Sequence, residues 1–314
     1  MNLLFTWGWP GMVAVLWLGL CVGSFLNVVI HRLPIMLERR WRADATAVLA
    51  DAALMTAGTP STPDDRRLSL PDSTIGISTE PKTDAPFNLM VPRSRCPHCG
   101  HTIRAHENIP VISWLALGGR CAACRAPISL RYPVVELLTA IASVAIIVSF
   151  GFTAFGLAAL VLTWMLIALT GIDFDTQLLP DQLTLPLLWL GLAVSVSVGP
   201  VDPATAILGA IAGYGVLWTV YWGFRLATGK EGMGYGDFKL LGALGAWLGW
   251  PVLPGVLLIA AVSGLAWALV GMLRGQHARG QTIAFGPFLA LGGWIALLWR
   301  DTLVALILPG LATA

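Results

Sequence analysis

The sequence predicts an all-α membrane protein that crosses a bilayer several times, and three observations lead to that prediction. Of the 314 residues, 56% are hydrophobic and only 11% are charged, with a mean hydropathy of +0.76, whereas an ordinary soluble domain has about 25% charged residues. Apolar stretches close to the ~20 residues needed to cross a hydrocarbon core recur along the chain. Lysine and arginine are concentrated in a few connections between these stretches.

Eight apolar stretches are the expected transmembrane helices. The first has neither a basic n-region nor a small-residue cleavage site, so we expect a retained helix and not a signal peptide. The sixth is short, and Pro251 and Pro254 interrupt the chain after it. The stretches are approximately residues 11–33, 134–150, 154–172, 182–198, 204–226, 237–250, 252–273 and 283–299, followed by a short apolar tail after Arg300.

The basic residues predict the orientation, because positive charge is retained on the cytoplasmic side of a membrane. With the N-terminus outside, only Arg300 of the nineteen lysines and arginines lies outside. The connections near 151–153, 199–203 and 251 contain no basic residue. Charge that simply gathers in long loops would explain the first loop, but it would not explain the short connections.

The loop at residues 34–133 divides into two parts. Residues 39–90 are rich in Ala, Thr, Ser, Pro and Asp without a sustained apolar period, so we expect a flexible insertion with at most a transient helix at 43–56. Residues 91–133 contain a cysteine module. The expected organisation is therefore a first helix at 1–33, a cytoplasmic loop domain at 34–133 and a membrane domain at 134–314.

Two CxxC pairs predict a zinc site in the second part of the loop. The pairs "CPHC" and "CAAC" are separated by residues 100–120 and supply Cys96, Cys99, Cys121 and Cys124. Two such turns can complete a tetrahedron around one ion and leave no open position for water, which is typical of a structural Zn²⁺ site. Disulfides or unrelated thiols are the alternatives, but a reducing cytoplasmic loop disfavours disulfides.

Aspartates at the cytoplasmic ends of expected helices are the candidate catalytic residues. Asp173, Asp175 and Asp181 lie between the third and fourth apolar stretches, and Asp237 opens the sixth. Charged residues near the hydrocarbon are costly and therefore mark functional candidates. Two carboxylates at one depth, Asp173 and Asp237, would suit a dyad that shares a proton. From the residues alone, helix capping explains these positions equally well.

Glycines next to Asp237 would suit a peptide substrate. Gly234 and Gly236 precede it in "GMGYGDFKL", and residues without a Cβ atom let a peptide backbone approach closely.

Five motifs together resemble the bifunctional prepilin peptidases, which are leader peptidases and N-methyltransferases of type IV pilus and type II secretion systems. They are "GSFLNVVIHRLP", the paired CxxC motifs, "ISLRYPVVELLTA", "IDFDTQLLPDQLTLPLLWLGL" and "GYGDFKLLGALGAWLGW". The resemblance covers about residues 11–34 and 96–300, with the motifs in the family's order. The 39–90 insertion is longer than the typical family loop.

The resemblance implies a bacterial inner-membrane aspartic protease of the GxGD kind, with its active site facing the cytoplasm. The catalytic aspartates would be Asp173 and Asp237, with Asp175 and Asp181 as site support or caps, and residues 134–314 would form the protease domain. The implied substrates are prepilins and pseudopilins, cut after a glycine. The implied partner is the lipid bilayer, and no nucleic acid is implied.

The resemblance also implies methylation of the new N-terminus with S-adenosylmethionine as donor. The residues carried over for that activity lie around the cytoplasmic loop, at Gly118, Gly119 and Glu136. A peptidase without methyltransferase activity is an alternative, as is a transporter with acidic residues inside the membrane. A zinc metalloprotease would need a motif such as HExxH, which the sequence lacks.

Overall fold

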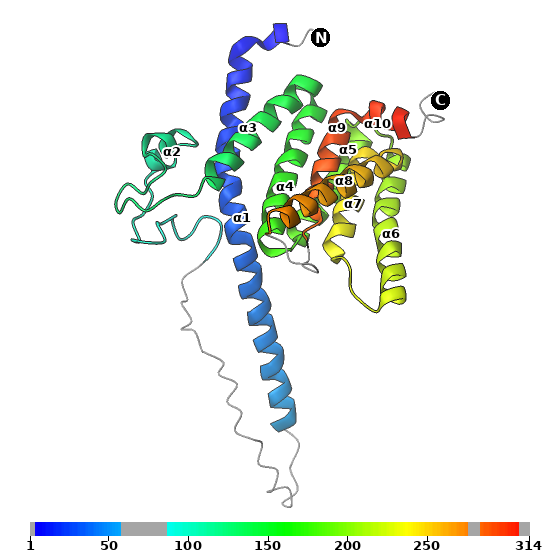
Figure 1. The fold of residues 1–314 in the computed structure, drawn as a ribbon, viewed down its shortest axis with the longest axis horizontal. Coiled ribbons are helices and arrows are strands. Elements are labelled where there is room, and N and C mark those ends of the chain that lie inside the picture. The colour runs from blue at the N-terminus through cyan, green and yellow to red at the C-terminus, as the bar shows by residue number, and fades with distance from the viewer. Residues whose placement is uncertain (1–3, 58–86, 276–282, 308–314) are drawn as a thin grey trace, which may run out of the picture. The chain divides into compact units, whose positions relative to one another are not determined.

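The computed structural model describes residues 4–57, 87–275 and 283–307 (Figure 1). Regular secondary structure in these ranges is helical apart from two isolated β-bridges, which confirms the all-α prediction. The chain forms two compact units, residues 32–94 and residues 1–31 with 95–314, and each is described by itself.

The first helix is longer than expected. α1 runs from Leu4 to Ala57, with a kink at Gly8, where φ is 58°. We expected it to end near residue 33 and residues 39–57 to belong to the flexible insertion, but these residues continue the helix. The sequence there is rich in alanine, the strongest helix former. The rest of the expected insertion, residues 58–86, lies outside the described residues.

The unit of residues 32–94 is organised around Arg32. Its guanidinium donates hydrogen bonds to the carbonyl oxygens of Asn88 and Pro92, at 2.9 and 2.6 Å. Arg39 lies over the ring of Phe87, 4.2 Å from its centroid. These contacts fasten residues 87–92 to the middle of α1.

The remaining helices follow the expected apolar stretches. In the cysteine module, a 3₁₀ helix η1 (Ala105–Asn108) precedes α2 (Ile112–Ala116). The longer helices are α3 (Arg131–Phe150), α4 (Ala154–Thr176), α5 (Asp181–Ser197), α6 (Pro203–Thr228), α7 (Tyr235–Leu248), α8 (Leu253–Leu273) and α9 (Gly286–Leu298), with η2 (Trp250–Val252) before α8 and α10 (Arg300–Ile307) after α9.

Length and composition separate these helices into two groups. Within the described residues, five helices are long and apolar enough to cross a membrane alone, namely α1, α3, α4, α6 and α8. A sixth span results if α9 and α10, bent by 101°, are counted as one. The eight expected positions are all helical, but α5, α7 and α9 have only 17, 14 and 13 residues.

The short helix α7 lies at the centre of the membrane helices (Figure 1). It packs against α5, α6 and α9, and Phe238, Leu240 and Leu244 on it are fully buried. A Cβ atom on Gly245 would collide with the backbone of Gly209 on α6. Glycine therefore lets α6 and α7 approach closely, as small residues do between membrane helices.

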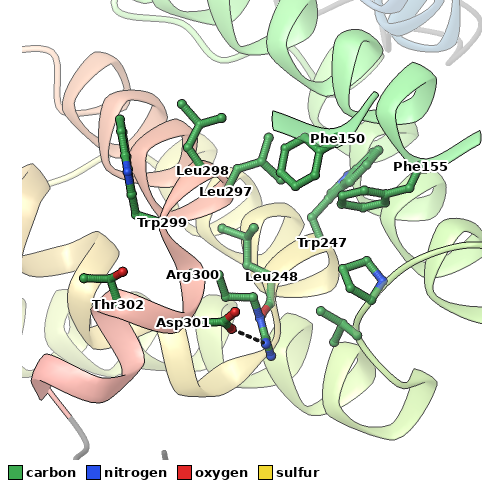
Figure 2. Close-up of a pocket in the computed structure, with 12 residues that line it drawn as sticks. Phe150, Phe155, Trp247, Leu248, Leu297, Leu298, Trp299, Arg300, Asp301 and Thr302 are labelled. Carbon is green, nitrogen blue, oxygen red and sulfur yellow. Dashed lines mark hydrogen bonds and ion pairs between the residues drawn. The ribbon is translucent and has the colours of Figure 1, made fainter. Parts of the chain in front are cut away.

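A cavity of about 240 Å³ lies at one end of these helices (Figure 2). It is lined from the start of α4, the end of α7 and the bend between α9 and α10. Arg300 and Leu248 both line this cavity, and Arg300 Nε donates a hydrogen bond of 3.2 Å to the carbonyl oxygen of Leu248. That bond satisfies a carbonyl at the end of α7 that has no partner within the helix.

Candidate functional site

The two aspartates expected to form a dyad are both buried at the other end of the helices. Asp173 lies one turn before the end of α4, and Asp237 lies in the first turn of α7. Their exposed fractions are 4% and 7%. Leu179 lies against Gly236, which precedes Asp237, and against Gly286, which bonds to Asp173. The fold therefore brings two acids 64 positions apart in the sequence (173 to 237) into one region of the structure.

Asp173 is held by a third helix. Its Oδ2 atom accepts a hydrogen bond of 3.0 Å from the backbone N–H of Gly286, the first residue of α9. A Cβ atom on Gly286 would lie only 2.6 Å from that oxygen, so the approach depends on glycine. We did not predict Gly286, because the Gly286–Pro287 pair signals only the start of a helix.

Asp237 contrasts with Asp173 in its hydrogen bonds. Its Oδ1 atom is buried and has no hydrogen-bond partner among the described residues. A buried polar atom without a partner is costly, and an ionised one is more costly still. Asp237 thus has one buried carboxyl oxygen without a hydrogen-bond partner among the described residues.

Leu179, in the connection between α4 and α5, lies against both Gly236 and Gly286. A Cβ atom on Gly236 would lie 2.6 Å from Leu179 Cβ, and one on Gly286 would lie 3.0 Å from Leu179 Cδ1. We expected Gly234 and Gly236 to let a peptide backbone approach closely, and in this structure the side chain of Leu179 lies against Gly236. Gly234 has no such neighbour, since the atoms nearest to its Cβ position are 4.0 Å away.

The two other aspartates form ion pairs between helices. Asp175 on α4 pairs with Arg131 on α3 at 2.7 Å, and Asp181, the first residue of α5, pairs with Lys239 on α7 at 2.6 Å. Both pairs are partly exposed. Each pair thus joins a helix that carries one of the buried aspartates to a neighbouring helix. Sequence reasoning did not identify Arg131 or Lys239.

The four cysteines form one cluster, between the first and second membrane spans. Their sulfur atoms all lie within 4.8 Å of one another, with Cys96 and Cys124 separated by 3.8 Å and Cys99 and Cys121 by 4.0 Å. Zn–S bonds of about 2.3 Å in a tetrahedron place sulfur atoms about 3.8 Å apart. The cluster therefore has the dimensions of a four-thiolate zinc site.

The two CxxC turns have the same local structure. Each is closed by an isolated bridge, Arg95 with Thr102 and Arg120 with Pro127. The backbone N–H of Gly100 donates to the carbonyl oxygen of Cys96, and that of Arg125 donates to the carbonyl oxygen of Cys121.

The pKa values of the thiols shift in different directions, since burial and the neighbouring thiols raise that of Cys99 to about 12 while backbone donors lower that of Cys96. The N–H groups of Cys99 and His98 lower the pKa of the Cys96 thiol to about 7. A lower pKa favours the thiolate, which is the form that binds a metal.

Two of the three residues expected to take part in methyl transfer, Gly119 and Glu136, have structural contacts. Gly118 and Gly119 adopt positive φ values of 60° and 68°, and a Cβ atom on Gly119 would lie 2.8 Å from the ring of Trp114. Glu136 on α3 is buried and accepts a hydrogen bond of 2.7 Å from the backbone N–H of Val111. Glu136 thus joins α3 to the module through Val111.

Comparisons with known proteins agree along nearly the whole chain. A family model described as the bacterial peptidase A24 N-terminal domain matches residues 17–150, and one described as the type IV leader peptidase family matches residues 160–269. No solved structure matches the chain.

Several curated relatives are named prepilin leader peptidase/N-methyltransferase. The one from Aeromonas hydrophila is 53% identical over 295 residues, which cover 94% of this chain and 93% of that protein. Those from Pseudomonas aeruginosa and Burkholderia pseudomallei are 50% and 49% identical, covering 90% and 93% of this chain and 89% and 86% of theirs.

Proposed function

Because this chain belongs to the peptidase A24 family of prepilin leader peptidase/N-methyltransferases, we propose that it removes the leader of type IV prepilins and pseudopilins with Asp173 and Asp237 as the catalytic pair. The observation that carries the proposal is the burial of these two carboxyl groups, at the end of α4 and the start of α7. Cleavage would follow a glycine of the substrate, at the cytoplasmic face of the bacterial inner membrane.

The chemistry follows from one shared proton. Adjacent carboxyl groups do not both ionise readily, so one is a carboxylate while the other keeps its proton. The carboxylate takes a proton from water, and the carboxylic acid donates one to the scissile carbonyl oxygen. Enclosure of both groups among α4, α7 and α9 keeps bulk water away from this exchange.

The neighbouring residues would support this pair. Asp175 and Asp181 are proposed to fix the ends of α4 and α5 through their ion pairs. Gly236 would make room for Leu179, and Gly234 would leave open space beside Asp237. In this organisation residues 134–314 form the protease domain, and the cysteine module precedes it.

For the cysteine cluster we propose one structural Zn²⁺ ion. Cys96, Cys99, Cys121 and Cys124 would hold it, because their spacing fits tetrahedral thiolate ligation. Such an ion would join the two CxxC turns and so stabilise the module. With four protein ligands it would have no open position for water, so the proposed hydrolysis does not involve it.

Methylation of the new N-terminus, with S-adenosylmethionine as donor, is the second proposed activity. The names of the relatives support it. We propose that the methyl-transfer site lies at the cysteine module. Gly118 and Gly119 within the module, and Glu136, which contacts it, are the residues to test first. A peptidase that lacks methyltransferase activity is the alternative.

One experiment tests both activities. The purified full-length protein is incubated with a prepilin in detergent or lipid, with and without S-adenosylmethionine, and the products are weighed by mass spectrometry. We expect loss of the leader in both samples and an added methyl group only with the donor. Leader removal without methylation would support the alternative, and proton or solute flux without cleavage would indicate a transporter.

A further inference from the structure

The hydrogen bonds of the two buried aspartates are unequal. Asp173 Oδ2 accepts a hydrogen bond of 3.0 Å from the N–H of Gly286. The carboxyl group of Asp237 has the backbone of Gly234 beside it, but its Oδ1 atom is buried without a partner among the described residues. A hydrogen bond to the charged form of a carboxyl group favours that form, and an unpartnered buried oxygen disfavours it. Both residues are aspartates, but their hydrogen-bond partners give the two carboxyl groups different environments.

We propose that Gly286 is a positioning residue that makes Asp173 the ionised, water-activating member of the pair and leaves Asp237 as the proton donor. This inference rests on the proposed function. Gly286 acts in two ways, because its N–H stabilises the carboxylate and its lack of a Cβ atom leaves room for Oδ2 at this distance.

The assignment gives a balanced reaction. Asp173 takes a proton from water as the water oxygen bonds to the scissile carbonyl carbon, and Asp237 gives its proton to the carbonyl oxygen. The resulting diol then returns a hydroxyl proton to Asp237 while the C–N bond breaks. The leaving amine takes its proton from Asp173, so both acids regain their starting forms.

The charged side chains around Asp173 have other partners, so they do not stabilise its carboxylate in place of Gly286. Arg131 and Lys239 are engaged by Asp175 and Asp181, and Glu136 accepts from Val111. The sequence of α9 contains no titratable side chain. Within the described residues, the titratable or charged side chains at this end of α4 and of the helices around it are His31, Arg131, Tyr132, Glu136, Asp175, Asp181, Tyr235, Asp237 and Lys239.

The test is the pH–rate profile of prepilin cleavage by full-length Gly286→Ala. The added methyl group would displace the Asp173 carboxylate, so we expect cleavage to fall by at least about tenfold, out of the 10²–10⁴-fold that a positioned acid or base contributes. The acidic limb of the profile should also move to higher pH, because the ionised form of Asp173 loses its donor.

Two glycine variants are matched controls. Gly292→Ala lies on the same helix and meets a backbone oxygen, that of Val256, at the same 2.6 Å. It should lower stability without moving the pH profile. Gly215→Ala on α6 meets no atom within 4 Å, so it should match the unchanged protein in both respects.

If Gly286→Ala alone fails to fold, a double variant still tests the inference. The methyl group at position 286 would also press on Leu179, so Gly286→Ala combined with Leu179→Ala removes that overlap and keeps the one with Asp173. If the profile of the folded variant stays unchanged, or if Gly292→Ala shifts it equally, the inference is wrong. If Asp173→Asn and Asp237→Asn still abolish cleavage in that case, the proposed function stands without it.

Discussion

Arg131 and Asp175 form an ion pair of 2.7 Å between the start of α3 and the end of α4. Asp175 lies two residues after Asp173, and Arg131, the first residue of α3, is within residues 91–133, which contain the cysteine module. The pair therefore connects the module to the helix end that carries the proposed catalytic acid.

Asp173→Asn and Asp237→Asn should each reduce prepilin cleavage by about 10²–10⁴-fold, because asparagine keeps the size and polarity but cannot transfer the proton. The double variant should be little worse than either single one, since members of a catalytic unit are not additive. Cleavage is measured by mass spectrometry. Methylation of an already processed pilin should persist and serves as the control for folding. Near-normal cleavage by either variant would refute the dyad.

Asp175→Asn should reduce cleavage far less than the dyad variants, and Arg131→Gln should have a similar effect. A partly exposed ion pair contributes only about 0–1 kcal/mol. The effects of the two changes should not add in the double variant, because both remove the same contact. Asp181→Asn with Lys239→Gln is the matched pair. A loss as large as that of Asp173→Asn would place Asp175 among the reacting groups.

The purified protein should contain about one zinc ion per chain. Replacing any of Cys96, Cys99, Cys121 or Cys124 by serine should lower that content, because each supplies one of four thiolates. Metal analysis measures the content, and Cys21→Ser in the first span is the control that should leave it unchanged. Unaltered zinc in all four variants would show that the metal is bound elsewhere.

The connection between α4 and α5 should face the cytoplasm. A cysteine introduced at Gln177 should not react with a membrane-impermeant maleimide in intact cells, whereas one at Val198 should, because the connection after α5 contains no basic residue. Labelling after cell lysis shows that position 177 is accessible. External labelling of position 177 in intact cells would overturn the proposed orientation.

The cysteine cluster was predictable from sequence because its spacing is local. Each CxxC pair forms within a few residues of the backbone, so the cluster requires only one contact between distant parts of the chain, that between the two turns. Asp173 and Asp237 were candidates because carboxyl groups are rare and costly beside hydrocarbon. Helix capping explained their positions equally well, and only the family resemblance implied that they are catalytic. Gly286 was not a candidate, since it acts through a backbone N–H 113 residues from its partner and has no side chain to attract notice.

Other features depend on packing or on a balance of propensities. The extension of α1 to Ala57 was underestimated because composition suggested disorder, while the helix propensity of alanine favoured continuation. The position of Leu179 between two glycines follows from the meeting of three segments, the α4–α5 connection, α7 and α9. No pattern within any one of them indicates it.

The length of α7 affects how deep in the bilayer hydrolysis would occur. Fourteen residues rise only about 21 Å at 1.5 Å each, which is less than the ~30 Å of hydrocarbon in a typical bilayer. The surrounding protein lets so short a helix exist without exposing its end groups to acyl chains. With its Leu248 end at the outer interface, its Asp237 end would lie several ångströms below the inner headgroups, so both the scissile peptide and a water molecule would have to descend to it.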